Sequence, residues 1–381
     1  MTNDYRQTLE TVLGVPFSEG NSVKPLKNGI EIFPKMLEAI SAAQRNIDFL
    51  TFVYWTGDIA KEFASALSER AQSGVKIRVI LDAFGAKSMP PEVLSQMLGA
   101  GIDVQWFRSF TRWKFWQIQH RTHRKILVVD GLVGFTGGVG IASEWEGNAR
   151  NKNEWRETHF QIEGPSLRGL QAAFLANWYE ACDEITYFEE PTTEARPGDT
   201  LVQVVQSTAT IGRSPIELLF RHLVDTAQHQ INLTTAYFVP DERMISALIR
   251  ASGRGIKIQI LIPGKHIDFR VAQQAGEAAY APLLKAGIKI WRYQPTMIHA
   301  KIMTVDHTVA VIGSANFNQR SMSKDDETNL VVIDPDLVAE LERDFEADQT
   351  RSQEFFPNKW RKRGIIQRIK ETISRPFRNH S

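Results

Sequence analysis

The chain of 381 residues contains an internal duplication, which sharply narrows the folds open to it. Four segments of the first half recur in the second half in the same order, each offset by about 180 residues. The matching pairs are 43–54 with 227–238, 74–81 with 255–262, 98–104 with 284–290, and 123–138 with 299–314. Four matches in one register indicate a duplicated unit rather than chance similarity. We therefore expect two halves that share one fold.

Helix and strand patterns alternate within each half. In the first half, residues 34–45 and 58–73 carry the apolar spacing of helices, with Asp58 as a candidate N-cap. Residues 47–54 and 75–81 are β-branched, aromatic or apolar runs of strand length. This βαβ rhythm predicts an α/β fold with helices on both faces of a sheet. We expect two similar α/β/α sandwich halves, each with a mixed, largely parallel sheet.

The two halves are predicted to meet near residues 189–200, where Pro, Thr and charged residues gather. We expect a first half over 1–190 and a second half over 200–350, each with one copy of the repeated motif. Residues 351–381 then form a separate basic tail.

Composition excludes several classes of protein. The formal net charge is +1, so the overall charge does not indicate a polyanion partner. Cys182 is the single cysteine, which excludes an intrachain disulfide framework and a cysteine-rich metal site. The sequence has no apolar run of about eighteen residues, and its N-terminus lacks the pattern of a signal peptide. Any membrane contact is therefore expected to be peripheral.

Both halves carry the spacing H-x-K-x4-D-x6-G, followed by Gly or Ser. The first copy consists of His123, Lys125, Asp130, Gly137 and Gly138, and the second of His299, Lys301, Asp306, Gly313 and Ser314, followed by Asn316. A histidine and a lysine two residues apart on a strand point to the same face. A lone H-x-K is a weak signal, but the full spacing found twice indicates one site with two such pairs. Asp130 and Asp306 end strands and precede turns, which favours a structural role for both.

Two histidines with two lysines suit phosphodiester chemistry. One imidazole can attack phosphorus and form a phosphohistidine, while the other protonates the leaving alkoxide and then activates the incoming alcohol or water. Lysines supply the positive charge that the phosphate oxygens need, so no metal and no cofactor are expected. Gly138, Ser314 and Asn316 are candidate phosphate-binding residues.

A nucleophilic histidine also needs a carboxylate that fixes its tautomer. Glu157 follows His123 by 34 residues, and Glu327 follows His299 by 28. Each precedes or enters an apolar strand pattern, so these two are predicted as the orienting carboxylates. The alternative is that both are solvated surface acids.

With these motifs, the sequence resembles the phospholipase D superfamily, whose signature is the duplicated H-x-K-x4-D. The resemblance spans roughly residues 20–350. It is greatest to bacterial cardiolipin synthases, through NGIEIFPKMLEAISAAQRNIDFLTFVY, HRKILVVDGLVGFTGG, WRETHFQIEGPSLRGLQAAFLANW and HAKIMTVDHTVAVIGSANFNQRSM. It implies an active site at the interface of the halves, with His123 as nucleophile, His299 as acid and no metal. The near-symmetry of the two motifs leaves the reverse assignment of the histidines open. It further implies transfer of a phosphatidyl group from phosphatidylglycerol to a second lipid alcohol, with release of glycerol.

Two departures from the family's pattern matter. The first motif ends GGVG, so Gly140 stands where the family usually has Asn, and one donor to the phosphate is missing or comes from the backbone. Many cardiolipin synthases carry N-terminal membrane spans, and this chain is expected to resemble the shorter, peripheral members. Other functions stay open: a phospholipase D-type hydrolase or nuclease with the same site, or a non-catalytic lipid-binding protein with a decayed site.

An insertion of about ten residues before the first motif is rich in aromatic and basic residues. Trp106, Trp113 and Trp116 are predicted to face lipid at the headgroup boundary. The basic tail 358–381, which contains Trp360, is predicted to lie as an amphipathic helix on an anionic membrane. The alternatives are an aromatic platform for single-stranded nucleic acid and, for the tail, a helix packed on the protein or a disordered segment. We expect a peripheral protein at the cytoplasmic face of the bacterial inner membrane; the acceptor lipid and the oligomeric state stay open.

Overall fold

One continuous mixed sheet runs through the molecule. The computed structural model describes residues 2–109, 119–183, 195–208, 214–277 and 280–356. Within them, the sheet has fifteen strands in the order β15-β11-β10-β9-β12-β13-β14-β8-β1-β7-β6-β5-β2-β3-β4. The strands of the first half are β1 (Ser18–Lys27), β2 (Asn46–Thr51), β3 (Lys76–Asp82), β4 (Asp103–Phe107), β5 (Ile126–Val129), β6 (Val133–Gly137) and β7 (Thr158–Glu163). Those of the second half are β8 (Thr200–Ser207), β9 (Gln230–Thr234), β10 (Lys257–Pro263), β11 (Lys289–Tyr293), β12 (Ile302–Val305), β13 (Val309–Gly313), β14 (Glu327–Ile333) and β15 (Ser352–Glu354).

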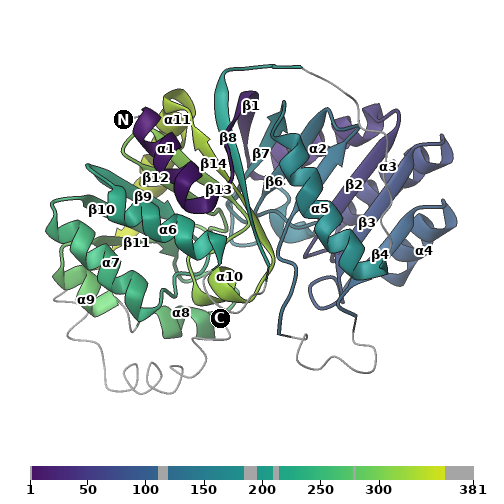
Figure 1. Cartoon of the computed structure of the whole chain (residues 1–381). Coiled ribbons are helices and arrows are strands. Elements are labelled where there is room, and N and C mark those ends of the chain that lie inside the picture. Colours follow the sequence, from purple (N-terminus) through teal and green to yellow (C-terminus); the bar gives the residue numbers. More distant parts are fainter. Residues whose placement is uncertain (1, 110–118, 184–194, 209–213, 278–279, 357–381) are drawn as a thin grey trace.

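The strand order repeats outward from the centre of this sheet. β1-β7-β6-β5-β2-β3-β4 extends to one side, and the equivalent β8-β14-β13-β12-β9-β10-β11 extends to the other, where β15 adds an edge strand. The antiparallel pair β1–β8 joins the two sets. Figure 1 shows the two halves on the right and left of this central pair. The predicted α/β fold with two similar halves is therefore confirmed.

The sheet is mixed, as predicted, but it is not largely parallel. Parallel pairing is confined to β2–β3–β4 and to β9–β10–β11. The other neighbouring strands of the described sheet run antiparallel, which corrects the sequence-based expectation. The reason lies in the short turns β5–β6 and β12–β13, because a turn of a few residues can join only antiparallel strands.

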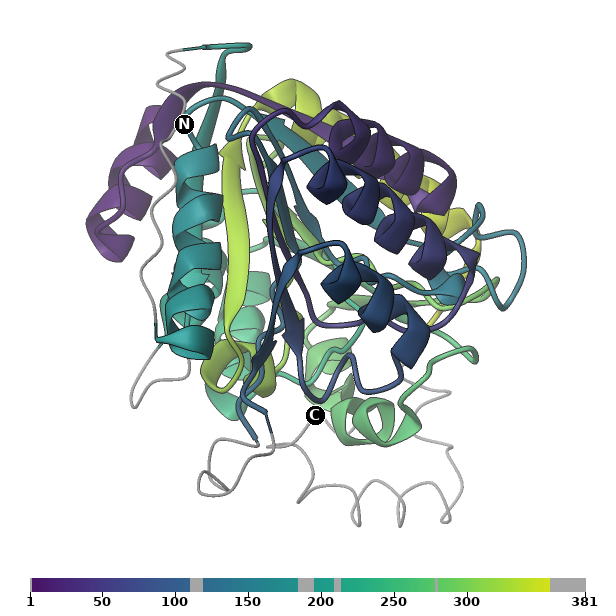
Figure 2. The ribbon, with the colours of Figure 1, turned by 90° about the vertical axis from the view of Figure 1, so that its right-hand side faces the viewer.

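Helices cover both faces of the sheet in each half. In the first half, α2 (Asn28–Ala42), α3 (Asp58–Gln72) and α4 (Pro91–Gly99) lie on one face and α5 (Leu167–Cys182) on the other (Figure 2). Residues along β2 alternate between these layers, since Phe49 packs with the first group of helices and Leu50 with α5.

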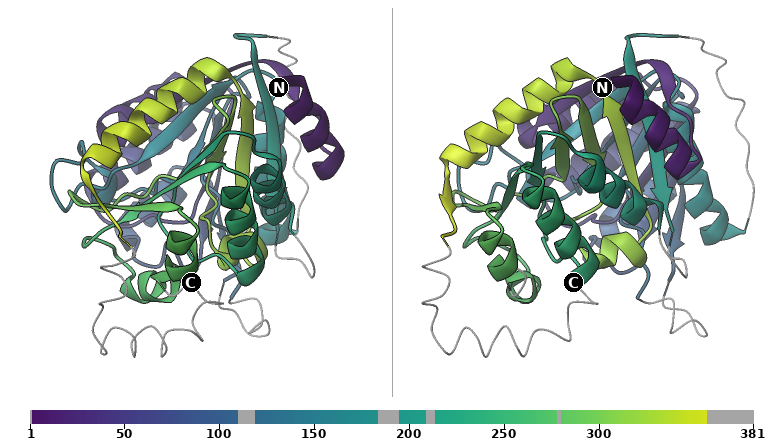
Figure 3. Two further views of the ribbon diagram at one scale, coloured as in Figure 1. Left: turned by 90° about the vertical axis from the view of Figure 1, so that its left-hand side faces the viewer. Right: turned by 60° about the vertical axis from the view of Figure 1, so that its left-hand side comes forward.

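The second half has the same layers. α6 (Pro215–Thr226), α7 (Glu242–Gly253), α9 (Tyr280–Lys285) and α10 (Gln319–Ser323) share one apolar core with the sheet, and α11 (Pro335–Thr350) packs against the opposite face (Figure 3). The short helix α8 (Arg270–Glu277) follows β10. Among the described residues, no helix is long and apolar enough to cross a bilayer.

The N-terminal helix α1 (Thr2–Leu13) packs against the second half, beside α6 (Figure 1). Tyr5 and Leu9 of α1 are buried in the core of that half, and the Tyr5 hydroxyl donates to Asp306 at 2.5 Å. The N-terminus therefore contributes to the half that lies further along the chain. β15 likewise joins the sheet from within the expected tail, at β11. Half of the predicted linker, residues 189–194, lies outside the described residues, and the domain boundaries stay a prediction.

The start of α3 differs from the sequence-based expectation. Asp58 is the first helical residue rather than the N-cap, a position that Gly57 occupies without a side-chain hydrogen bond. The carboxylate of Glu146 supplies the missing cap, because it accepts from the Ile59 N–H at 2.8 Å. A cap that comes from a residue far along the chain leaves no local sequence signal.

Candidate active site

Strand register brings each H-x-K motif to the same end of the strands, the end at which the parallel strands of its half finish. His123 and Lys125 immediately precede β5, whose first residue Ile126 pairs with Leu50 near the end of β2. In the second half, Ile302 at the start of β12 pairs with Thr234 at the end of β9. Each motif therefore lies beside the carboxyl ends of the parallel strands of its own half.

Backbone pairing across the halves joins the two motifs. The His123 N–H donates to Asp326 O at 2.9 Å, next to Glu327. The His299 N–H donates to Arg156 O at 2.7 Å, next to Glu157. The residue before each histidine thus forms a bridge with the residue before the carboxylate of the other half.

This pairing exchanges the carboxylates between the halves. His123 Nδ1 lies 3.0 Å from Glu327 Oε1, and His299 Nδ1 lies 2.7 Å from Glu157 Oε2. Chain order suggested that each glutamate orients the histidine before it, but the structure places it on the other histidine. The two glutamates are completely buried, so they are not the solvated surface acids of the alternative interpretation.

The electrostatics of the site fix the tautomer of both histidines. Burial alone would raise the pKa of Glu157, but Lys301 and His299 outweigh it and lower this pKa to about 2. Burial is likewise outweighed at Glu327, where His123 and Lys125 lower the pKa to about 2. An ionised carboxylate only accepts, so each histidine donates through Nδ1–H and its Nε2 is the unprotonated nitrogen.

The other ionisable groups of the site are shifted towards their neutral forms. Burial, with a contribution from the lysine of the same motif, lowers the pKa of His123 and of His299 to about 4. Burial lowers the pKa of Lys125 to about 7 and that of Lys301 to about 8. Both imidazoles are therefore neutral near pH 7, as a nucleophile must be. Among the described residues, no group of three or more His, Cys, Asp or Glu side chains could hold a metal ion.

Each lysine folds back over its own histidine. The Lys125 ammonium donates to His123 O at 2.6 Å, and the Lys301 ammonium donates to His299 O. Lys301 Nζ also lies 2.9 Å from His299 Nδ1 and 3.2 Å from His299 Nε2. Positive charge is thus held beside the imidazole ring of His299.

The motif aspartates lie away from this chemistry, at the far ends of β5 and β12. Asp130 accepts from the backbone N–H groups of residues 44–46 at 2.8–2.9 Å. Asp306 accepts in the same way from residues 228–230 at 2.7–2.9 Å. Each aspartate therefore ties the turn before one strand to the turn after its neighbour.

The candidate phosphate-binding residues have different surroundings. The Ser314 hydroxyl donates to Glu327, so the structure gives it a carboxylate partner rather than a free direction into the site. Gly138, its equivalent, touches Glu157 directly, since a Cβ there would lie 2.4 Å from Glu157 Oε2. Asn316 is 3% exposed, and its Oδ1 atom is buried without a hydrogen-bond partner.

Gly140 occupies the position equivalent to Asn316 and has no room for a side chain. A Cβ there would lie 2.7 Å from Val53 and 3.1 Å from the Trp145 ring. Trp145, at the end of the short helix η2 (Ser143–Trp145), fills this space. The two halves of the site are therefore similar in their histidines and different beside them.

Aromatic rings pack on both histidines, and the sequence analysis did not identify them. The Trp145 and Trp155 rings lie 5.3 Å and 5.4 Å from the His299 ring. The Phe52 ring lies 5.2 Å from the His123 ring and 5.3 Å from Lys125 Nζ. These rings restrict water around the histidines and strengthen the charge interactions there. The motif spacing gives no signal for them, because they come from other elements.

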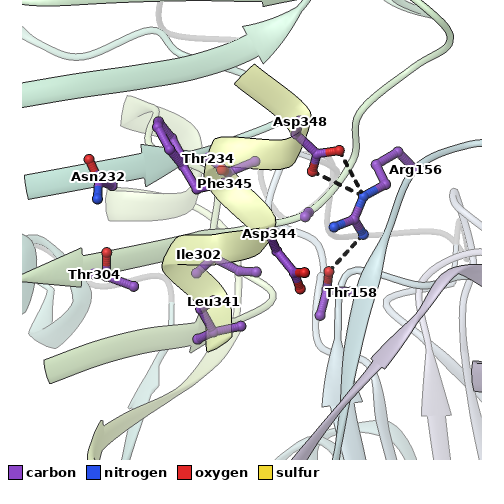
Figure 4. Close-up of a pocket in the computed structure, with 11 residues that line it drawn as sticks. Arg156, Thr158, Asn232, Thr234, Ile302, Thr304, Leu341, Asp344, Phe345 and Asp348 are labelled. Atoms are coloured by element: carbon purple, nitrogen blue, oxygen red, sulfur yellow. Dashed lines mark hydrogen bonds and ion pairs between the residues drawn. The ribbon is translucent and has the colours of Figure 1, made fainter. Parts of the chain in front are cut away.

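A buried ion pair supports the backbone that carries Glu157 (Figure 4). The Arg156 guanidinium contacts Asp348 of α11 at 3.0 Å, and it also donates to Glu157 O at 2.6 Å and to Thr158 Oγ1 at 2.9 Å. It thus ties α11 to the residue that orients His299. These contacts are also absent from the sequence prediction.

Of the four predicted lipid-facing tryptophans, the structure describes Trp106. Trp106 lies in β4, where it is half-buried and packs against the core of the first half, which argues against a free lipid-facing position. Its neighbour Phe107 is fully buried. Trp113, Trp116 and Trp360 lie outside the described residues, so the predictions for them stay open.

Comparisons with known proteins agree with this geometry. The family model described as "Cardiolipin synthase, PLD-like domain" matches residues 36–155 and 220–349. Cardiolipin synthase 1 of Bacillus cereus is 34% identical over 95% of this chain and 73% of its own length. Cardiolipin synthase A of Pseudomonas aeruginosa is 32% identical over 94% of this chain and 73% of its own length.

The solved structure of phosphatidylserine synthase from Haemophilus influenzae aligns with 98% of this chain and 97% of its own, with a TM-score of 0.74. At 14% identity, that likeness shows the shared fold. The family model covers both repeats, and the relatives exceed 30% identity over nearly the whole chain. The chain therefore belongs to the cardiolipin synthase family of the phospholipase D superfamily.

Proposed function

We propose that this protein is a phosphatidyltransferase of the cardiolipin synthase type. It moves a phosphatidyl group from phosphatidylglycerol to a second lipid alcohol through a phosphohistidine. One observation carries the proposal: two neutral histidines, each fixed by a buried carboxylate from the other half, meet at one edge of the sheet with a lysine beside each. Membership of the cardiolipin synthase family supports the choice of substrate.

In the first step, His123 Nε2 attacks the phosphorus of phosphatidylglycerol. The N–P bond forms as the bond from phosphorus to the glycerol oxygen breaks, and the proton on His299 Nε2 passes to that oxygen. Lys125 and Lys301 stabilise the charge on the non-bridging oxygens. Glycerol leaves, and His299 is neutral.

In the second step, the hydroxyl of a second lipid attacks the same phosphorus. His299 takes the hydroxyl proton, the P–O bond forms and the bond to His123 breaks. The enzyme returns to its starting state with cardiolipin as product when the acceptor is also phosphatidylglycerol. Water in place of the lipid alcohol would give phosphatidic acid, so exclusion of water by the aromatic rings favours transfer.

The acid role of His299 depends on the bound substrate. Burial lowers the pKa of its imidazole to about 4, so the free enzyme does not hold the proton near neutral pH. A phosphodiester brings a negative charge next to the ring, which favours the imidazolium and raises this pKa. Glu157, already ionised, stabilises the same imidazolium from the other side.

Lipid analysis with the purified chain tests the proposal. Vesicles of phosphatidylglycerol are incubated with the parent protein or with His123→Ala, and the lipids are measured by mass spectrometry. The control variant is His229→Ala, because His229 is exposed and directly precedes β9, at the end of that strand away from the motif. Cardiolipin and glycerol from the parent and from His229→Ala, but not from His123→Ala, would support the transferase. Phosphatidic acid would make the protein a hydrolase. If neither cardiolipin nor phosphatidic acid forms, single-stranded DNA becomes the next substrate to test.

A further inference from the structure

Two exposed phenylalanines lie at the same edge of the sheet as the histidines. Phe84 is 49% exposed and follows β3, while Phe269 is 48% exposed and precedes α8, which lies at the lower edge of the second half in Figure 1. β3 and β10 are equivalent strands, each parallel to the strand that ends beside a catalytic motif. The loops that follow them therefore lie on the active-site side of each half.

Direct contacts connect the first of these loops to the site. The Trp55 indole N–H donates to Gly85 O at 2.6 Å, and Gly85 lies against Phe52. Phe52 in turn packs on His123 and Lys125. The loop that carries Phe84 is thus held at the mouth of the site.

The second loop is held in a similar way. The Tyr237 hydroxyl donates to Asp268 at 2.7 Å, and Asp268 acts electrostatically on His299 and Lys301. The backbone N–H of Phe269 also donates to Asp268 at 2.7 Å. Asp268 therefore holds the backbone of Phe269 in place and also affects the charge of His299.

Basic side chains accompany both phenylalanines. Lys87 Nζ lies 4.9 Å from the Phe84 ring, and exposed Lys265 and Arg270 flank Phe269 in the chain. Lys152, from the first half, also lies near this rim. Burial lowers the pKa of His266, and the charges of Lys265 and Lys152 lower it further, so both lysines are close to His266. Asp268 is the acid among them, and its carboxylate is bound by Tyr237. Apolar rings with cations beside them match the boundary between acyl chains and anionic headgroups.

We propose that Phe84 and Phe269 insert into the headgroup region of an anionic phospholipid bilayer while Lys87, Lys265 and Arg270 contact lipid phosphates. The inference rests on the proposed function and deepens it, because it names the surface through which the site takes its lipids. One anchor comes from each half, so the site opens towards the bilayer between them. A lipid then reaches the histidines without crossing bulk water.

The test compares binding to vesicles of phosphatidylglycerol and of phosphatidylcholine by co-sedimentation. Two variants of the full chain are compared with the parent. One carries both Phe84→Ala and Phe269→Ala, and the other carries Leu132→Ala as a control at an exposed apolar residue. Leu132 is 46% exposed and lies in the β5–β6 turn, at the opposite end of the strands. We expect the double variant to lose binding to phosphatidylglycerol vesicles by about tenfold or more, and Leu132→Ala to retain it. Equal binding by the double variant and the parent would overturn the proposal.

The basic residues are tested separately. Lys87→Gln with Lys265→Gln should weaken binding to phosphatidylglycerol vesicles by about fivefold per lysine, the change that corresponds to about 1 kcal/mol for each basic residue at an anionic surface. Binding to phosphatidylcholine should change little. A double lysine variant that binds both vesicles as the parent does would contradict the charge pairing. Loss of single-stranded DNA binding by the phenylalanine variant, with vesicle binding intact, would assign this face to nucleic acid instead.

A short-chain phosphatidylglycerol that stays monomeric separates this inference from the proposed function. The phenylalanine variant should lose at least about five times more of its turnover on vesicles than of its turnover on the monomer. Equal losses on both would overturn the docking role. Vesicle binding that depends on Phe84 and Phe269, in a chain that turns over neither lipid, would refute the transferase and leave the docking surface supported.

Discussion

His123 and Glu327 are 204 residues apart in the chain, yet Nδ1 of the first lies 3.0 Å from Oε1 of the second. His299 and Glu157 form the reciprocal contact at 2.7 Å. Each half therefore lacks the carboxylate that fixes its own histidine and supplies the one needed by the other. The duplicated fold yields one active site, and neither half alone holds a complete histidine–carboxylate pair.

The exchange of carboxylates predicts which step each glutamate supports. If Glu157 acts through the acid His299, Glu157→Gln should slow the first step with phosphatidylglycerol by about a hundredfold. The loss in the first step should be much smaller with a phosphatidyl ester of nitrophenol, because that leaving group departs without a proton. Glu327→Gln acts through the nucleophile His123, so its first step should slow by about the same factor on both substrates. Single-turnover rates of glycerol and nitrophenol release measure the difference.

Exchanged roles of the two histidines, with His299 as nucleophile and His123 as acid, would give the opposite pattern. Glu327→Gln would then be rescued by the nitrophenyl ester, and Glu157→Gln would not. A second readout is the phosphohistidine trapped with the nitrophenyl ester. It should accumulate in Glu157→Gln, where His299 activates the acceptor poorly, and should be scarce in Glu327→Gln.

The sequence was sufficient to predict the duplicated fold and the residues at the centre of the site. These features depend on repetition and spacing, which are visible along the chain. The partner of each carboxylate was not predictable, because the bridges Thr122–Asp326 and Arg156–Ile298 join segments from different halves. Sequence order suggests pairing within a half, and only the association of the halves reverses it.

The surroundings of the site were less predictable still. Ser314 has the chemistry of a phosphate ligand, but the structure directs its hydroxyl to the buried Glu327. Trp106 belongs to an aromatic and basic stretch, but β4 places it against the core. The alternation of helix and strand patterns likewise gave no sign of the short hairpins β5–β6 and β12–β13, which add antiparallel pairs to the sheet. In each instance a residue's type was informative and its direction depended on tertiary packing.

The position of Gly140 predicts that the usual asparagine of the family is not tolerated there. Gly140→Asn places a Cβ 2.7 Å from Val53 and 3.1 Å from Trp145, so it should lower the free energy of unfolding by about 1–3 kcal/mol. Lipid turnover should fall rather than rise, since Trp145 packs on His299. Denaturant titration and lipid turnover of the same preparation measure both effects.

Removal of the Trp145 ring gives the added side chain more room. We expect Gly140→Asn to cost less stability in a Trp145→Ala background than in the parent, although Trp145→Ala is itself destabilising. A stable Gly140→Asn single variant with higher turnover would show that the first half accepts the family's asparagine after all.

The buried pair Arg156–Asp348 predicts a large cost when one partner is removed. Asp348→Ala leaves the buried guanidinium without its carboxylate and should lower the free energy of unfolding by about 3–5 kcal/mol. The exposed helix pair Arg221–Asp225 provides a control, and Asp225→Ala should cost less than about 1 kcal/mol. Denaturant titration of the two variants measures this difference, and similar costs would contradict the prediction.

The buried pair also supports Glu157 directly, through the bond from Arg156 to its backbone oxygen. Replacing both partners with apolar residues, Arg156→Met with Asp348→Leu, should restore most of the stability. It should not restore turnover, because the backbone that carries Glu157 loses its anchor. Full recovery of both properties would limit the pair to a role in folding.

The shifted pKa values of the site predict how turnover depends on pH. The ratio kcat/KM reports the free enzyme. It should rise as pH approaches about 4, where His123 loses a proton and becomes nucleophilic. Above about 4 it should decline, because His299 of the free enzyme loses the proton that it must donate. It should fall more steeply as pH passes about 7 to 8, where Lys125 and then Lys301 lose the charge that binds the phosphodiester. The sign follows from burial, which lowers the pKa of a lysine and so moves its loss of charge into this range.

The lysine origin of the alkaline fall can be tested with Lys125→Arg. A guanidinium stays protonated throughout this range, so the fall near pH 7 should move upward towards the remaining transition of Lys301, even if the maximal rate is lower. The fall in kcat should also occur at higher pH than the fall in kcat/KM, because the bound phosphodiester stabilises the charged lysines. An alkaline fall that keeps its position in Lys125→Arg would assign it to another group.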